Sequence, residues 1–125
     1  MTRTTISAPH APAPVGPYSH AALGPDGTLF LSGQTPIDPA TGRLLDGDVA
    51  VQTRQVFANL TSVLAAAGRT LEDVIKVNVY LVDMEDFTAM NSVYAGTFSA
   101  PYPARTTVAV AGLPLGARVE IELVA

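Results

Sequence analysis

The sequence predicts an α+β domain in which one mixed β-sheet carries two helices on a single face. Short stretches with β-type alternation and two stretches with apolar residues at helical spacing follow one another along the chain. Their order is strand, strand, helix, strand, helix, strand, strand. Both helices link strands and must bury an apolar stripe, and one face of a shared sheet is the simplest surface for this. We therefore expect a single domain over residues 1–125.

The chain is expected to begin with a proline-rich arm over residues 1–17. Its four prolines exclude a helix and favour an extended chain that leads into the domain. Two strands, 18–21 and 28–32, follow around a Gly-Pro-Asp-Gly turn and are predicted to form a hairpin. Gly33 comes directly after the second strand, where the missing side chain allows a close backbone approach. Residues 37–47 contain turn-forming pairs and are predicted to be a loop.

Two segments have the apolar spacing of amphipathic helices. The first begins after Asp48, a residue type that favours the N-cap, and ends before Gly68. The second runs from Phe87 to Phe98, and the acidic residues before it suit the positive end of a helix dipole. Between the helices, residues 74–83 alternate between two sets of side chains, which predicts a strand with one fully buried face.

The last two strands are predicted to form an antiparallel hairpin over residues 101–123, closed by a loop that contains glycine and proline. Burying the apolar side chains of both strands together sets the register. Arg105 then lies opposite Glu122 and Thr107 opposite Glu120, so that all four side chains project from one face. Arg105 and Glu120 become diagonal neighbours, about 7–8 Å apart between backbones.

This arrangement suits a small carboxylate and a water molecule. An arginine fork can hold a planar carboxylate through two parallel hydrogen bonds. A carboxylate beside it can orient or deprotonate a water. The same spacing is also that of ordinary ion pairs on a solvated strand face. The spacing alone leaves both interpretations open.

Composition narrows the class of protein. Seven basic and eleven acidic residues give a net charge of −4, and without a basic cluster this argues against nucleic acid as the main partner. The lack of cysteine excludes disulfides, thiolate catalysis and zinc–thiolate sites. His10 and His20 lack the spacing of metal ligands or of a Ser–His pair, so we expect no metal site. No apolar run has membrane-spanning length and no hydrophobic signal core is present, so a cytoplasmic location is expected.

The apolar fraction is high relative to the charge. Apolar residues make up 48% and charged residues 14% of the chain, so part of the apolar surface is expected to be covered in an oligomer. The sheet face opposite the helices would carry the remaining semi-polar side chains. That face is the candidate for contact with another subunit.

The assembled motifs resemble those of the RidA family, also called the YjgF/YER057c/UK114 family. The resemblance runs nearly end to end and rests on the joint order and spacing of the motifs. They are Gly16-Pro17-Tyr18-Ser19, Ser32-Gly33-Gln34, the 76–83 strand, Phe87 with Met90-Asn91-Ser92-Val93-Tyr94, Tyr102-Pro103-Ala104-Arg105, and Leu113-Pro114 followed by Val119-Glu120-Ile121-Glu122.

The resemblance implies a chorismate-mutase-like α+β fold, a homotrimer with sites at its subunit interfaces, and no cofactor. It also implies hydrolysis of 2-imino acids or their enamine tautomers, such as 2-iminopropanoate and 2-iminobutanoate, to 2-oxo acids and ammonia. Members of the family dispose of reactive imine and enamine species that pyridoxal-phosphate enzymes release.

The family's functional residues carry over by position. Arg105 would hold the substrate carboxylate, and Glu120 would activate the attacking water. Thr107 stands where many relatives carry cysteine, so any thiol-based reactivity of relatives is in doubt for this chain, whereas hydrolysis is not. The substrate-binding set implied by the resemblance is Arg105, Tyr18, Gly33, Phe87, Asn91 and Thr107.

Other functions stay open. The chain could be a non-catalytic trimer that binds a small carboxylate metabolite or a partner protein. It could also be a related enamine hydrolase of a catabolic pathway. Endoribonuclease activity has been attached to some relatives, but the acidic balance and the lack of a histidine pair or basic groove argue against it here.

Overall fold

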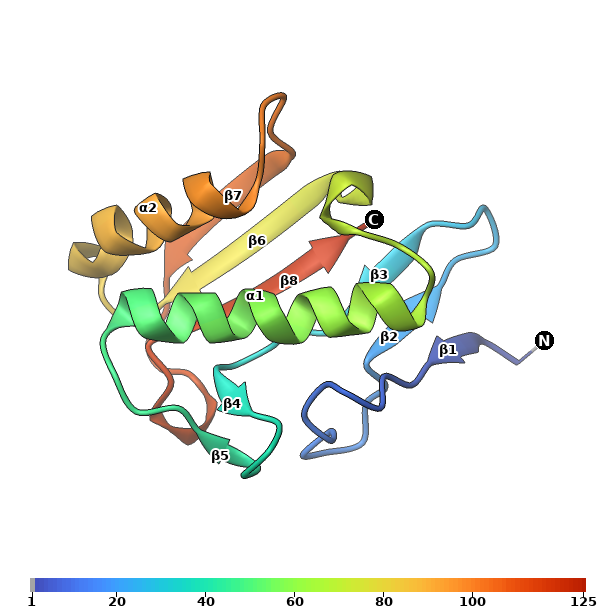
Figure 1. Ribbon diagram of the computed structural model, residues 1–125, viewed down its shortest axis with the longest axis horizontal. Coiled ribbons are helices and arrows are strands. Elements are labelled where there is room, and N and C mark those ends of the chain that lie inside the picture. The colour runs from blue at the N-terminus through green and yellow to red at the C-terminus, as the bar shows by residue number, and fades with distance from the viewer. Residues whose placement is uncertain (1) are drawn as a thin grey trace.

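The computed structural model describes residues 2–125 and confirms the predicted α+β architecture. A six-stranded mixed sheet with strand order β1-β2-β3-β8-β6-β7 carries both helices on one face (Figure 1). Two further short strands, β4 and β5, form a separate pair. The strands are β1 (Thr4–Ile6), β2 (Ala21–Leu23), β3 (Leu29–Leu31), β4 (Ile37–Asp38), β5 (Arg43–Leu44), β6 (Lys76–Leu81), β7 (Ala104–Ala109) and β8 (Val119–Val124), and the helices are α1 (Val49–Ala66) and α2 (Phe87–Thr97).

The core lies between the two helices and the central strands of the sheet. Each fully buried aliphatic side chain stabilises the fold by about 1.5–3 kcal/mol relative to an exposed one. Three aromatic rings, those of Phe57, Tyr94 and Phe98, pack against one another between the helices. The largest buried aliphatic residues of α1, β6 and β8 are Val56, Leu60, Val63, Leu64, Val77, Val79, Leu81, Val119, Ile121 and Leu123.

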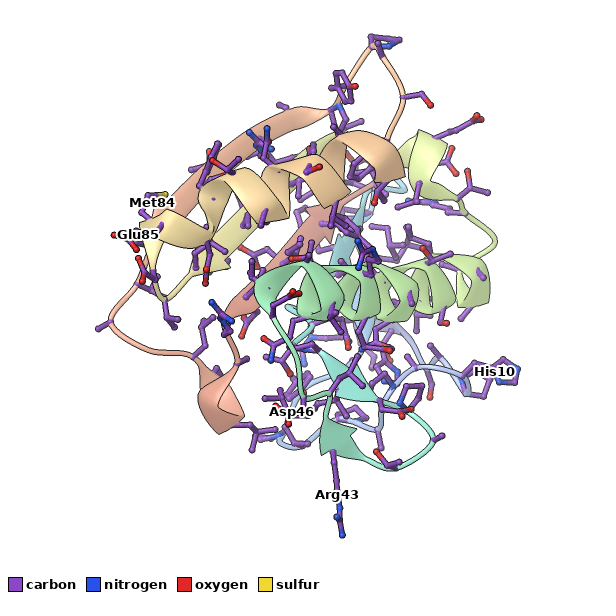
Figure 2. The ribbon with its side chains drawn as sticks, turned by 60° about the vertical axis from the view of Figure 1, so that its left-hand side comes forward. His10, Arg43, Asp46, Met84 and Glu85 are labelled. Atoms are coloured by element: carbon purple, nitrogen blue, oxygen red, sulfur yellow. The ribbon has the colours of Figure 1, made fainter. Side chains whose placement is uncertain are left out.

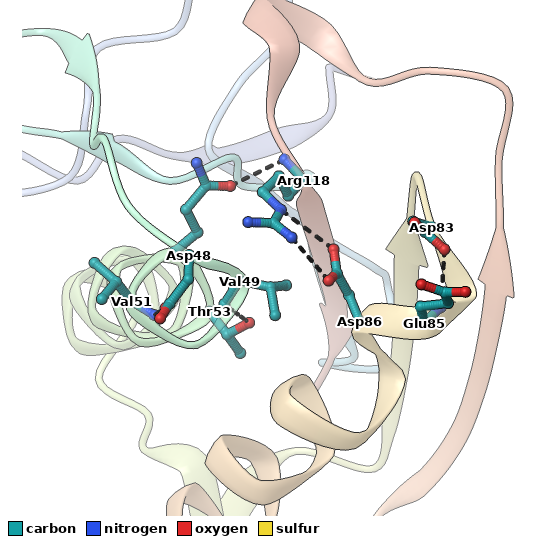
Figure 3. Close-up of polar contacts among 9 residues, drawn as sticks. Asp48, Val49, Val51, Thr53, Asp83, Glu85, Asp86 and Arg118 are labelled. Carbon is teal, nitrogen blue, oxygen red and sulfur yellow. Dashed lines mark hydrogen bonds and ion pairs between the residues drawn. The ribbon is translucent and has the colours of Figure 1, made fainter.

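Acidic side chains stand before both helices and make different contacts there (Figure 3). As predicted, Asp48 is the N-cap of α1 and accepts a hydrogen bond from a backbone N–H of the first turn at 2.9 Å. Asp83 caps the short 3-10 helix η2 (Met84–Asp86) that leads into α2. Asp86 forms an ion pair with Arg118 at 2.8 Å, with a second hydrogen bond from Nε at 3.2 Å. The N-cap residue of α2 is thereby tied to the residue that precedes β8.

The predicted hairpin over residues 101–123 is wrong. β6 lies between β7 and β8, parallel to the first and antiparallel to the second. The register therefore pairs Arg105 with Val77 rather than Glu122, and Glu120 with Tyr80 rather than Thr107. β6 is an interior strand because it pairs along both of its edges, and α2 supplies the crossover that parallel neighbours require. The connection from β7 to β8 passes the end of β6 instead of closing a tight turn.

Two segments contain strands that the sequence pattern does not predict. β1 lies within the expected arm and pairs antiparallel with β2. β4 and β5 pair within the segment predicted to be a loop. β2 also begins at Ala21, at the end of the predicted strand 18–21, and it pairs with β3. These strands have only two or three residues each, which is too short to show a periodic pattern.

A buried histidine holds the arm against the sheet. The Ala8 N–H donates to Nδ1 of His20 at 2.9 Å, and the ring's other nitrogen donates to the Pro12 carbonyl at 2.7 Å. Since Nδ1 accepts a hydrogen bond, the ring is neutral and carries its proton on Nε2. His10, by contrast, projects from the arm away from the body of the molecule (Figure 2).

No helix within residues 2–125 is both long and apolar enough to cross a membrane. Within the same residues, no three His, Asp or Glu side chains converge as metal ligands would.

Candidate functional site

Arg105 and Glu120 lie on opposite faces of the sheet, so the expectation that they share one face is wrong. Arg105 is paired with Val77, whose face is covered by the helices. Glu120 is paired with Tyr80, on the face that the helices leave open. The error follows from the false hairpin, because inserting β6 between the two strands changes which side chains are neighbours. One chain thus carries two separate half-sites, here called the arginine side and the glutamate side.

On the arginine side, the guanidinium of Arg105 makes a hydrogen bond and cation–π contacts with side chains of α2. The Nη1 of Arg105 donates to Oδ1 of Asn91 at 2.7 Å. Its guanidinium carbon lies 4.5 Å from the ring centroid of Tyr94 and 5.5 Å from that of Phe87, which is cation–π distance. Among residues 2–125 the structure gives Arg105 no carboxylate partner. The guanidinium is therefore oriented but not neutralised.

An open cavity of about 440 Å³ adjoins this guanidinium. Two hydroxyls on this side, those of Tyr94 and Thr107, are buried without a hydrogen-bond partner among the described residues. Burial raises the pKa of the Tyr94 hydroxyl, and the charge of Arg105 opposes that shift. The cavity is lined by Asn91, Tyr94, Ala95, Tyr102, Pro103 and Arg105.

On the glutamate side, Glu120 lies against the backbone of Gly33. A Cβ built on Gly33 would overlap the carboxylate of Glu120, so the close approach expected at this glycine is an approach to a side chain. Burial raises the pKa of Glu120, and the neighbouring charge of Glu122 raises it further. The pocket here has a volume of about 400 Å³ and is lined by Val15, Tyr18, Ser32, Gly33, Thr35, Pro114, Leu115, Glu120 and Glu122.

The expected site residues thus divide into two groups. Arg105, Asn91, Phe87 and Thr107 lie on the arginine side, and the structure brings the first three into contact. Tyr18, Gly33 and Glu120 line the pocket of the glutamate side. Within one chain the two groups do not meet.

Sequence reasoning missed two residues of these half-sites. Tyr94 forms the aromatic surface beneath Arg105, and its spacing of three from Asn91 on the same helix is a signal that would have found it. Tyr80 donates a hydrogen bond to Glu122 from β6. No local signal indicates Tyr80, because its partner is on another strand.

Comparison with known proteins shows which family the chain belongs to. A family model described as Endoribonuclease L-PSP matches residues 8–125. The chain belongs to this family, also known as YjgF/RidA. The matched residues therefore include every strand after β1, both helices and both half-sites.

Several relatives in the RidA family are similar over nearly their full length. A RutC family protein of Pyrococcus horikoshii is 50% identical over 98% of this chain and 97% of its own. Proteins of Bos taurus and Homo sapiens named 2-iminobutanoate/2-iminopropanoate deaminase are 45% and 42% identical, each over 100% of this chain and 90% of its own. The names thus range from a specific reaction to a family label alone.

Solved structures show the same fold. RidA from an Antarctic Psychrobacter superposes with a TM-score of 0.92 at 46% identity, over 98% of both chains. The YjgF gene product of E. coli has a TM-score of 0.91 at 38% identity, over 98% of this chain and 97% of its own. The α+β arrangement of one sheet with two helices is therefore that of the RidA family.

Proposed function

We propose that the protein hydrolyses 2-imino acids and their enamine tautomers, such as 2-iminopropanoate and 2-iminobutanoate, to 2-oxo acids and ammonia. The observation that carries the proposal is the guanidinium of Arg105, oriented by Asn91 and Tyr94 and left without a carboxylate. A guanidinium in this state is suited to a small carboxylate ligand. The proposal is supported by the names of the mammalian relatives, which share 42–45% identity with the chain.

The separation of the two half-sites supports a site shared between copies of the chain. The arginine side of one copy would face the glutamate side of the next, and three such contacts would close into a homotrimer. The open face of the sheet has the apolar surface that such a contact needs, since Phe30 is 53% and Val108 40% exposed. Beside the two pockets, Tyr102 and Leu115 are 54% and 61% exposed.

The chemistry then needs orientation, an acid–base group and no cofactor. Arg105 binds the carboxylate and presents the C=N carbon of the protonated imine, which is already electrophilic. Glu120 accepts a proton as a water oxygen bonds to that carbon, and the product is a tetrahedral amino alcohol. Glu120 then gives this proton to the amino group, and the C–N bond breaks as the hydroxyl passes its own proton to Glu120. The 2-oxo acid leaves, and ammonia takes up that proton and leaves as ammonium. The raised pKa of Glu120 suits this two-way transfer.

The remaining site residues shape the pocket. Phe87 and Asn91 hold Arg105 in place. Tyr18 lines the wall beside Glu120, and Gly33 lets the carboxylate approach the backbone. Thr107, in the position of the family's cysteine, contributes backbone groups and no thiol, so the proposed hydrolysis does not depend on it.

The test is to generate 2-iminopropanoate with a serine dehydratase and to follow its decay spectroscopically. We expect the protein to accelerate the decay and Arg105→Ala to lower kcat/KM by roughly 10²–10³-fold, since a charge-assisted bidentate contact is lost. The matched control is Arg43→Ala, because Arg43 is exposed and points away from the molecule (Figure 2). Absence of acceleration by the wild-type protein would refute the proposal.

A non-catalytic binder of small carboxylates is the second candidate, favoured by the same free guanidinium. A binder would gain thermal stability from 2-oxobutanoate and lose that gain in Arg105→Ala, yet it would leave the rate of imine decay unchanged. A related enamine hydrolase would accelerate the decay of a different enamine and leave the decay of 2-iminopropanoate unchanged. RNA cleavage has less support, because the net charge is −4 and phosphate binding needs concentrated positive charge.

A further inference from the structure

A second carboxylate lies beside Glu120, and the proposed reaction leaves it without a role. Glu122 is two residues further along β8, so its side chain projects from the same face, with Cα atoms about 7 Å apart. Both carboxylates line the same pocket, next to Tyr18 and Gly33. Neither forms an ion pair with a basic side chain among residues 2–125. Two negative groups thus share a partly enclosed space.

Glu122 is held by hydrogen bonds, whereas Glu120 is not. The hydroxyl of Tyr80 and the side-chain amide of Asn78 both donate to Oε1 of Glu122. In the β6–β8 register Asn78 lies opposite Glu122 and Tyr80 lies opposite Glu120, so Tyr80 reaches diagonally across the sheet. The described residues donate no hydrogen bond to Glu120, whose carboxylate only packs against Gly33. The structure therefore fixes one carboxylate and leaves the other able to react.

The other groups around Glu120 do not cancel the charge of Glu122. Lys76 is on the same face of β6, but its Nζ donates to Oγ1 of Thr106 at 2.7 Å, at the far end of the strand. The loop residues of the pocket carry no charge, and Arg105 of the same chain is on the opposite face. The bond to Glu122 raises the pKa of Tyr80 to about 12, so the hydroxyl stays a donor at neutral pH.

We propose that Glu122 is a positioning residue for the proposed hydrolysis, held by Tyr80 and Asn78 so that its charge strengthens the hold of Glu120 on a proton. In a shared site, Arg105 of the neighbouring copy favours ionised Glu120, and Glu122 opposes that effect. Glu120 can then accept a proton from water and return it to the leaving amine. The catalytic part of this inference rests on the proposed function, whereas the coupling of the two carboxylates does not.

The coupling is tested without any substrate. Glu122→Gln keeps an oxygen that can accept from Tyr80 and Asn78 and removes only the charge. Followed by carboxyl ¹³C NMR, the pKa of Glu120 should fall by roughly half a unit to one unit, because a like charge has been removed. Glu72→Gln removes the same charge from the 3-10 helix η1 (Leu71–Asp73), before the start of β6, and should leave the titration of Glu120 unchanged.

The variant Tyr80→Phe and the pH dependence of kcat/KM separate the coupling of the two carboxylates from its effect on catalysis. In Tyr80→Phe, Glu122 loses a hydrogen bond, so its charge is less fixed and the pKa of Glu120 should fall by a smaller amount. The acidic limb of kcat/KM for 2-iminopropanoate should move to lower pH in both variants, since the ionised form of Glu120 is the base.

An unchanged Glu120 titration in Glu122→Gln, or in Tyr80→Phe if the first variant does not fold, overturns the inference. A shifted titration in a protein that does not accelerate imine decay refutes the proposed function and leaves the coupling in place. A shifted titration with an unmoved pH profile overturns the catalytic role of Glu122.

Discussion

The two half-sites differ in how they are built. The arginine side lies on one helix and an edge strand, and aromatic rings from the core hold its cation. The glutamate side lies where a central strand meets the loop after β3, and a pinned arm covers it. The first is an extension of the core, whereas the second is built on a loop and on an arm that two histidine hydrogen bonds hold. The proposed carboxylate-binding group and the proposed base are therefore supported by separate parts of the fold.

The largest expected effect tests whether the two sides meet between copies. Arg105→Ala and Glu120→Gln should each be nearly inactive alone. If each site takes its arginine from one copy and its glutamate from the next, a refolded equal mixture should regain about a quarter of the wild-type activity, from random assembly. The measurement is imine decay before and after mixing. Mixed oligomers that form, as mass spectrometry would show, without regaining activity would contradict a shared site.

A smaller effect tests the close approach on the glutamate side alone. Gly33→Ala places a methyl group where the Glu120 carboxylate lies, and the displaced base should lower kcat by at least about tenfold. The control is Gly96→Ala, because a Cβ there meets no atom within 4 Å; that variant should keep full activity. Equal activity of the two variants would show that the position of Glu120 is not critical.

The arm provides a test on stability. In His20→Ala the buried Ala8 N–H and Pro12 carbonyl lose their partner, so the free energy of unfolding should fall by about 1–3 kcal/mol in urea titrations. The exposed His10 makes no such bonds, and His10→Ala should change stability by less than about 0.5 kcal/mol. A loss of similar size in both variants would mean that the arm is not pinned by His20.

The smallest expected effect compares two tyrosines, one on each side. Tyr94→Phe removes a buried hydroxyl that has no partner in the described chain, so stability should be unchanged or rise by about 1 kcal/mol. Tyr80→Phe removes a hydroxyl bonded to Glu122, and stability should fall by about 0.5–1.5 kcal/mol. Thermal unfolding of both variants measures the difference. A destabilised Tyr94→Phe would reveal a partner for that hydroxyl, for example in a neighbouring copy.

The parts of the fold that depend on neighbouring residues could be predicted from the sequence. The spacing of apolar residues located α1 and α2, Asp48 marked the start of α1, and alternation located β6. The pairing of β7 and β8 could not be predicted in this way. Two strands joined by a loop with glycine and proline read as a hairpin, and no local feature shows that a strand from earlier in the chain enters between them.

Because strand pairing could not be predicted from local patterns, the relative position of the site residues could not be predicted either. Arg105 and Glu120 were recognised from motifs in the chain, and each now has defined neighbours. Their relative position was wrong, because it was inferred from the false hairpin. Which face a residue occupies depends on strand pairing over the whole sheet, so it lies beyond any argument from local spacing.

β8 also bears on how such a protein can change during evolution. Its odd-numbered residues, Val119, Ile121 and Leu123, are in the core, and its even-numbered residues Glu120 and Glu122 face the open pocket. Substitutions at the even positions change the lining of the pocket while the packing that maintains the fold stays intact. An insertion or deletion of one residue within β8 would exchange the two sets and destroy both at once. We therefore expect the chemistry of this pocket to change through point substitutions in β8, and changes of length to be tolerated only outside the strand.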